Sequence, residues 1–163
     1  MFYVANVDQQ ELKEGGLCLK SLAEWVQKKG NKLVVICGDL ESELAELKED
    51  EREEFRREFG LEGSSLERLI QIGYEILSLV TFYTTVSSEL RAWTVPKETP
   101  APKAAGKIHS DMERGFIRAE VISFSDFITC GSEHTARERG LLRSEGKDYL
   151  IRDGDIVHFR FNV

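Results

Sequence analysis

The first residues with a pattern that could do chemistry are Asn6, Val7, Asp8 and Gln9, directly after the apolar run at residues 2–5. An apolar run of aromatic and β-branched residues predicts a buried strand. The Asn6 amide at the end of this strand offers one acceptor and two donors, so it can pair with a purine edge such as adenine N6 and N7. An Asx turn, in which Asn6 accepts the backbone N–H two residues on, is the commoner outcome of such a short motif.

The elements that follow place a second loop beside Asn6. An amphipathic helix is predicted over residues 11–29 and a fully apolar strand over residues 32–37, which together with the first strand form a βαβ unit. A right-handed crossover makes the two strands parallel, with their carboxyl ends at one edge. Ligands of open α/β sheets bind outside that edge, so we expect the loop at residues 38–40 to face the same ligand as Asn6.

A second candidate site is cationic. Its members run along a predicted short helix at residues 101–115 and into the next strand: Lys103, Lys107, Arg114 and Arg118. We expect them to share one surface with His109 and Arg91. Phosphate contacts need little more than such a cluster. Ordinary solvated surface charges are the commoner origin of the pattern.

No sequence pattern in the chain predicts a catalytic or metal centre. A Gly-x-x-x-x-Gly-Lys-Ser/Thr stretch, which would hold phosphates and Mg²⁺, is absent. The three cysteines and three histidines lack metal-ligand spacing, and the cysteines are expected to be reduced thiols. His109 and Asp111, two residues apart on a predicted helix, should not face each other. A helix-capping role for Ser110 or Asp111 is favoured instead.

Two further helices are predicted before residue 80. Residues 40–60, capped by Asp39, mix acidic and basic side chains, which is typical of an exposed helix with internal ion pairs. Residues 64–80 begin with a capping box from Ser64 to Glu67 and carry apolar residues at helical spacing. We therefore expect this second helix in the core.

From about residue 81 the pattern changes to short strands rich in Thr, Val and aromatic residues. The elements predicted there are, in order, a hairpin at residues 81–95 around Ser87 and Ser88, a helix at 101–115, a half-buried strand at 116–124, an irregular helical stretch at 125–142 interrupted by Gly131 and Gly140, and two final strands around a turn at 153–155. A small mixed sheet over one helix is the β-grasp arrangement, and the chain as a whole is predicted to be α+β.

Composition predicts a folded, soluble chain, with 41% hydrophobic and 31% charged residues. The apolar stretches are far shorter than the roughly 20 residues of a membrane-spanning helix. No secretory signal is present, so the cytosol is the expected compartment. The net charge of −7 lies within residues 1–88, and residues 89–163 are neutral overall, so any RNA-binding surface must be local.

Several stretches resemble the YchF family of Obg-like ATPases. From Leu90 onward, RAWTV, PKAAGKIHSDMERGFIRAEVISFSDF and EGKDYLIRDGDIVHFRFNV are similar to the C-terminal TGS domain of that family. FYVANV, ESELAEL and LERLIQIGYEILSLVTFYT resemble the family sequence before that domain. The resemblance implies that residues 1–80 are the C-terminal portion of a P-loop GTPase-type domain and residues 81–163 a TGS β-grasp domain. It also implies that the phosphate loop and the earlier strands lie upstream.

The resemblance implies a nucleotide site at the first turn. The family uses Asn-x-x-Glu where related GTPases have Asn-Lys-x-Asp, and it prefers ATP to GTP. Asn6, Val7 and Gln9 are therefore expected to contact the adenine of ATP, with Mg²⁺ held by residues outside this chain. Gln9 stands where the family has Glu, and because a guanine edge requires a carboxylate acceptor, Gln9 does not favour GTP.

The resemblance also implies a partner for the second part of the chain. TGS domains occur in ribosome- and tRNA-associated proteins, which implies that Lys103, Lys107, Arg114 and Arg118 face RNA or the ribosome. The leading hypothesis is a C-terminal segment of a translation-associated ATPase that is inactive alone. The alternative is a stand-alone β-grasp adaptor that binds protein or RNA without nucleotide. A small enzyme that uses His109 or Cys130 is the least favoured hypothesis.

Overall fold

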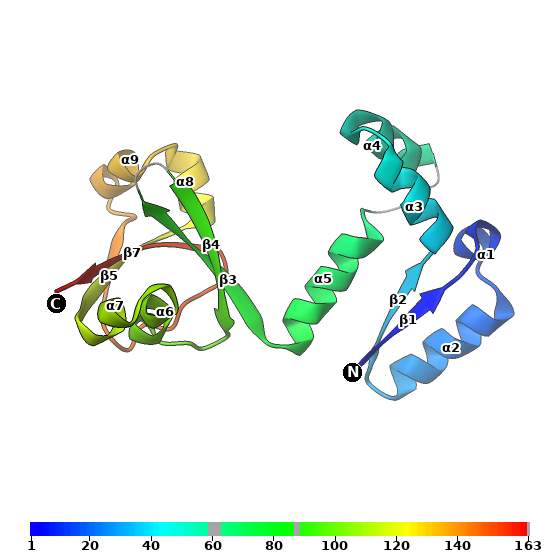
Figure 1. The fold of residues 1–163 in the computed structure, drawn as a ribbon, viewed down its shortest axis with the longest axis horizontal. Helices are drawn as coiled ribbons and strands as arrows, with labels where there is room; N and C mark the ends of the chain where they lie inside the picture. Colours follow the sequence, from blue (N-terminus) through cyan, green and yellow to red (C-terminus); the bar gives the residue numbers. More distant parts are fainter. Residues whose placement is uncertain (59–62, 87–88, 163) are drawn as a thin grey trace. The chain divides into compact units, whose positions relative to one another are not determined.

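The computed structural model describes residues 1–58, 63–86 and 89–162, which form two compact units, Met1–Ile76 and Leu77–Val163 (Figure 1). Each unit has its own sheet and its own hydrophobic core. The predicted α+β class is confirmed. Within these ranges the structure contains no helix with the length and apolar character that crossing a membrane requires.

The first unit is built on two parallel strands, β1 (Phe2–Asn6) and β2 (Lys32–Ile36), which confirms the predicted βαβ unit. Because Asn6 pairs with Ile36, both strands end at the same edge. The connection holds two helices, α1 (Gln9–Glu14) and α2 (Leu17–Lys28), rather than the single helix predicted over residues 11–29. Gly15 follows α1 with φ of +69°, a conformation that glycine adopts without strain because it has no Cβ.

Three helices complete the first unit: α3 (Gly38–Glu46), α4 (Glu49–Glu58) and α5 (Ser65–Ile76). The single helix predicted over residues 40–60 is interrupted at Leu47, whose backbone is extended, and the end of that prediction lies outside the described residues. Arg52 donates hydrogen bonds to the carbonyls of Leu44 and Leu47, both at 2.9 Å. The Leu44 carbonyl also accepts the Leu47 N–H at 3.3 Å, so Arg52 adds a second donor there and supplies a donor to the Leu47 carbonyl just after α3.

The core of the first unit is small. Its buried apolar residues are Val26, Val34, Cys37, Leu40 and Leu44. The prediction that the helix at residues 64–80 belongs to the core is wrong, because none of the described side chains of α5 is buried and its apolar residues Leu66 and Ile70 are more than half exposed. Helical spacing shows that a helix has an apolar face, but it does not show what covers that face.

The second unit holds a five-stranded mixed sheet with the strand order β4-β3-β7-β5-β6. Its strands are β3 (Leu79–Val86), β4 (Glu89–Pro96), β5 (Phe116–Ser123), β6 (Arg143–Glu145) and β7 (Asp155–Phe161). The neighbours β3 and β7 are parallel, and the other neighbouring pairs are antiparallel. This strand order with a helix on one face is the β-grasp arrangement, and this unit adds helices on the other face as well.

The predicted hairpin is confirmed as β3 and β4, and its turn at Ser87 and Ser88 lies outside the described residues. The predicted strand before the turn at residues 153–155 is wrong, because Leu150 makes an isolated bridge with Pro100 instead of joining the sheet. The short strand β6 has no counterpart in the prediction.

Helices cover both faces of this sheet (Figure 1). On one face α6 (Ala101–Ile108) and α7 (Ser110–Arg114) occupy the stretch predicted as one helix, and Ala104 and Ala105 of α6 pack into the main core with Phe82 and Phe159. On the other face α8 (Phe124–Cys130) and α9 (Glu133–Glu138) pack around Ile122 and Ile156. Since adjacent residues of a strand point to opposite faces, these two clusters lie on opposite sides of the sheet.

A β-bulge in β5 changes which of its side chains are buried. The pairing with β7 shifts between Phe116 and Arg118, so Phe116 and Ala119 are both buried. A strict two-residue alternation would have placed them on opposite faces. Beyond the bulge the alternation is regular and directs Arg118 and Glu120 away from α6.

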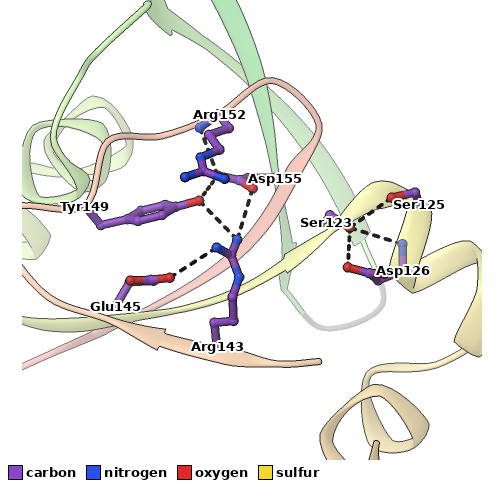
Figure 2. A network of polar contacts seen from close by, with 8 residues as sticks. All are labelled: Ser123, Ser125, Asp126, Arg143, Glu145, Tyr149, Arg152 and Asp155. Carbon is purple, nitrogen blue, oxygen red and sulfur yellow. Dashed lines mark hydrogen bonds and ion pairs between the residues drawn. The ribbon is translucent and has the colours of Figure 1, made fainter. Parts of the chain in front are cut away.

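A polar network around the buried Asp155 holds the last loop of the second unit (Figure 2). The Asp155 carboxylate, which is 2% exposed, accepts hydrogen bonds from the Tyr149 hydroxyl at 2.8 Å and from the Arg152 backbone N–H at 2.9 Å. Arg143 donates to the Tyr149 hydroxyl at 3.2 Å and pairs with Glu145 at 3.3 Å. Burial and the hydrogen bond to Asp155 raise the pKa of Tyr149. The network pins the loop at residues 149–155 to β6 and β7.

Candidate functional site

Asn6 lies at the carboxyl edge of the two-stranded sheet, as predicted, and its side chain joins the two strand ends. The Asn6 Oδ1 accepts a hydrogen bond from the Gly38 backbone N–H at 2.9 Å. This partner is the first residue of α3, just after β2, so the bond is not the local Asx turn that was the alternative. A Cβ on residue 38 would lie 3.4 Å from Asn6 Oδ1, an ordinary contact distance, so the bond does not depend on glycine at this position.

The other two predicted contacts, Val7 and Gln9, lie on either side of Asp8, where β1 leads into α1. The Val7 backbone N–H donates to the Ile36 carbonyl at 2.9 Å, so a ligand that contacts the Val7 backbone would do so through its carbonyl. Gln9 is the first residue of α1 and is half-buried. Asp8 is the N-cap of that helix and accepts the Glu11 N–H at 2.7 Å, so its carboxylate has a structural role.

The turn therefore presents a fixed amide at an exposed strand end. The Asn6 Oδ1 is held by Gly38, and the two Nδ2 donors are oriented by that bond. Such an amide can pair with the edge of a purine base. The loop after β2 differs from the prediction in one detail, because Cys37 takes the N-cap position of α3 and Asp39 lies in its first turn. Among the described residues there is no cluster of His, Cys, Asp and Glu that could hold a metal ion.

The four predicted cationic residues do not gather on one surface. Lys103 pairs with Glu113 at 2.6 Å, and Arg114 pairs with Asp111. Lys103 and Lys107 lie on α6, whereas Arg118 lies on the opposite face of the sheet, where it pairs with Glu120 at 3.0 Å. Arg91 pairs with Glu89 at 2.8 Å. The expectation of one shared cationic surface is wrong because sheet alternation separates Arg118 from the α6 lysines.

The arginines that lie beside Arg118 come from distant parts of the chain. Arg160 of β7 and Arg137 of α9 approach the same carboxylate, Glu120, at 3.1 and 3.5 Å. Hydrogen bonding from Arg160, and then from Arg118, lowers the pKa of Glu120. Sequence reasoning missed Arg137 and Arg160. The one available signal was the alternation of Phe159, Arg160 and Phe161, which directs Arg160 away from the core.

His109 and Asp111 approach each other although the sequence predicted that they would not. His109 precedes α7 in an extended conformation, and its Nδ1 accepts the Asp111 backbone N–H at 3.2 Å and lies 3.5 Å from the Asp111 carboxylate. The hydrogen bond from Arg114 is the main cause that lowers the pKa of Asp111. His109 is thus the helix cap, the role predicted for Ser110 or Asp111. Cys130 packs against the apolar cluster around Ile122 rather than beside this pair.

Comparisons with known proteins identify the family of this chain. The YchF-GTPase_C family model, described as a protein of unknown function (DUF933), matches residues 79–162. The ribosome-binding ATPase YchF of Escherichia coli O157:H7 is 48% identical over 161 residues, which are 99% of this chain and 44% of that relative. The protein of the same name from Bacillus subtilis (strain 168) is 42% identical over 165 aligned residues, covering 100% of this chain and 45% of that relative.

A solved structure agrees with these sequence matches. The structure of the Schizosaccharomyces pombe YchF GTPase matches with a TM-score of 0.90 at 30% identity, over 98% of this chain and 43% of that one. The chain spans less than half the length of the curated relatives that it matches. The family model alone covers more than half of the chain. The chain belongs to the YchF family, in which it corresponds to the C-terminal part.

Proposed function

We propose that this chain supplies adenine recognition and a ribosome- or RNA-binding TGS module to a YchF-type ATPase of the cytoplasm. The observation that carries the adenine part is the Asn6 side chain, which is fixed at the strand end by Gly38. The names of the relatives describe ribosome-binding ATPases, which supports both parts. The matches to these relatives span both units, which favours this function over a stand-alone adaptor.

In this proposal Asn6, Val7 and Gln9 contact the base of ATP. The Asn6 Nδ2 donates to adenine N7, and the remaining acceptor capacity of Oδ1 takes the N6 amino group. The Val7 carbonyl and the Gln9 amide border the base. Residues that would hold the phosphates and Mg²⁺ are not present in this sequence, so that part of the site lies elsewhere in the YchF protein.

The second unit supplies the partner surface in this proposal. Lys103, Lys107, Arg114 and Arg118 are the contacts that the sequence suggests for ribosomal RNA, and phosphate binding requires accessible cations of this kind. Because Lys103 and Arg114 already pair with carboxylates of α7, each would exchange an intramolecular ion pair for a phosphate. That exchange favours contacts by residues that keep unused N–H donors, such as Arg118.

A nucleotide titration tests the adenine proposal. The chain is fused to the N-terminal part of the Escherichia coli relative, and the dissociation constants of ATP and GTP are measured by calorimetry for the parent and for Asn6→Ala. We expect the parent to prefer ATP and the variant to lose about tenfold of that preference, because a bidentate contact to a base edge provides roughly 1–3 kcal/mol of discrimination.

The matched control is Gln10→Ala, which removes an exposed amide from the same helix start. It should leave the preference for ATP unchanged. A preference that survives Asn6→Ala would show that another group recognises the base. The chain by itself should not hydrolyse ATP, and turnover at the rate of a complete relative would contradict the assignment of phosphate and Mg²⁺ binding to residues outside it.

A further inference from the structure

A cationic surface that the sequence did not indicate lies on the sheet face opposite α6. Arg118, Arg137 and Arg160 each direct a guanidinium group at Glu120, at 3.0, 3.5 and 3.1 Å. The arginine side chains are between 45% and 65% exposed, whereas the Glu120 side chain is 12% exposed. These three arginines and Glu120 are called the arginine face below.

The arginine face carries an excess of positive charge. One carboxylate balances one of the three guanidinium groups, and Glu120 is held in its ionised form by the hydrogen bonds from Arg160 and Arg118. A guanidinium has five N–H donors in a planar fork, and the bonds to Glu120 use few of them. The remaining donors are exposed and suit the oxygens of a phosphate.

A cleft of about 550 Å³ opens between the hairpin and β7, on the side of the sheet that α6 and α7 cover, so the arginine face lies across the edge of β7 from it. Its walls include the apolar side chains of Trp93, Ile108, Met112 and Phe161, and its rim includes Thr85 and His158. Pockets that hold small ligands have volumes of roughly 300–1,000 Å³, so the cleft is large enough for a nucleobase.

The cleft follows the edge of β7. Tyr83 and Ile156 are the residues that pair β3 with β7 in the described part of the chain, although both strands continue beyond them. Val157, His158 and Phe159 all line the cleft. Because consecutive residues point to opposite faces, a cleft lined by all three must lie along the strand edge. It is therefore reached from beside the sheet.

His158 joins the cleft to the arginine face. It lines the cleft and stands directly opposite Glu120 in the pairing of β5 with β7. Residues paired in this way have Cβ atoms about 4.5–5.5 Å apart. Arg160 follows two residues later on the same face of β7 as His158, and Phe161 then points to the cleft. Polar side chains, His158 and Arg160, thus alternate with aromatic ones, Phe159 and Phe161, along one strand.

We propose that this surface binds single-stranded RNA, with backbone phosphates on the arginine face and one unstacked base in the cleft. The choice of RNA rests on the proposed function, and the location of the site does not. The positive charge complements a polyanion, and the aromatic wall gives a base a stacking partner. A duplex does not fit, because its bases are stacked inside the helix and cannot enter a cleft.

The test uses the full chain with Trp25→Phe, which leaves Trp93 as the single tryptophan because the sequence has two. The probe is an oligouridylate of about 12 nucleotides, a length within the range of single-strand binding sites. We expect saturating binding to quench Trp93 emission. An abasic oligomer of the same length should bind about fivefold or more weakly and leave the emission unchanged, because it has phosphates but no bases to stack.

The salt dependence of RNA affinity in three double variants shows which cations contact the phosphates. Arg137→Ala with Arg160→Ala should lower the slope of log affinity against log salt by about 1.4, because each phosphate contact on a single strand contributes roughly 0.7. Lys103→Ala with Lys107→Ala removes the same charge from α6 and should lower the slope less than the arginine pair does. Arg137→Lys with Arg160→Lys keeps the charge and should keep the slope, which separates lost contacts from lost folding.

A third variant tests the base. Phe161→Ala, at a side chain that is 41% exposed, should weaken the oligouridylate and reduce the quenching while the salt slope stays the same. A slope carried by the α6 lysines, or binding without quenching of Trp93, would overturn this inference and leave the RNA role of the chain intact. If neither the oligouridylate nor purified ribosomes bind the chain at low salt, the RNA role itself is wrong.

Discussion

The two units differ in how completely they bury their apolar residues. The second unit closes a five-stranded sheet between two helical layers, with cores on both faces and a polar network around the buried Asp155. The first unit has a two-stranded sheet and leaves Val4, Leu66 and Ile70 at least 46% exposed. A two-stranded sheet has little stability of its own, and parallel strands are normally covered on both faces. We infer that the second unit provides most of the stability of this chain.

The largest change in stability is expected from shortening a buried apolar side chain in the second unit, compared with an exposed one in the first. Phe82→Ala should lower the free energy of unfolding of the second unit by roughly 3–5 kcal/mol, because Phe82 is fully buried and contacts Phe159. Ile70→Ala in α5 should change the first unit by less than about 0.5 kcal/mol, because that side chain is already half exposed. Urea unfolding in single-tryptophan backgrounds measures both, with Trp25→Phe to follow the second unit through Trp93 and Trp93→Phe to follow the first through Trp25. Equal effects would show that α5 is buried in solution.

A somewhat smaller effect is expected from the polar network. Asp155→Ala should destabilise the second unit by about 2–3 kcal/mol, because the Tyr149 hydroxyl and the Arg152 N–H lose their buried acceptor. Asp148→Ala, at an exposed aspartate of the same loop, is the control and should have almost no effect. The same urea titration gives both values. A loss in unfolding free energy well below about 2 kcal/mol for Asp155→Ala would mean that water replaces the lost acceptor.

Acid should weaken the second unit through Glu120. The folded pKa of this carboxyl lies below its ordinary value of 4.5. Its contribution is therefore complete above pH 4.5 and is lost as the pH falls through the folded pKa. Glu120→Gln should make the urea midpoint of the second unit less dependent on pH in this range. An unchanged acid dependence in the variant would show that other carboxyls cause it.

The smallest expected effect on stability is in the first unit. Asn6→Ala removes the bond to the Gly38 N–H, which is close to solvent, so the first unit should lose only about 0.5–1 kcal/mol. Trp25 emission during urea unfolding measures this loss, and Trp93 emission should show no change. A loss of several kcal/mol would mean that Asn6 is chiefly a structural residue.

The sequence predicted the elements well where local chemistry decides them. The βαβ unit, the hairpin, the strand at 116–123 and the helix end at Gly131 all follow from apolar periodicity and glycine. The helix breaks at Gly15 and Leu47 were missed because helical periodicity continues across them. The burial of α5 was predicted wrongly, because an apolar helix face does not show which other part of the protein packs against it.

The candidate sites show the same limit. Asn6 and the loop at Gly38 could be predicted to meet, because parallel strands end at one edge. Arg118 could not be matched with Arg137 and Arg160, because that requires the register of β5 with β7 and the bulge after Phe116. A shift of one residue in a strand moves every side chain to the other face. Sequence position alone therefore grouped Arg118 with the α6 lysines.

The central claim is that the first unit recognises the base of a nucleotide while the second binds RNA. The most direct measurement compares Asn6→Ala with the Arg137→Ala and Arg160→Ala double variant in the fusion to the N-terminal part of the Escherichia coli relative. We expect Asn6→Ala to reduce the preference for ATP over GTP and to leave oligouridylate binding unchanged, and the arginine variant to do the reverse. If either variant alters both binding reactions equally, the division of roles between the two units is wrong.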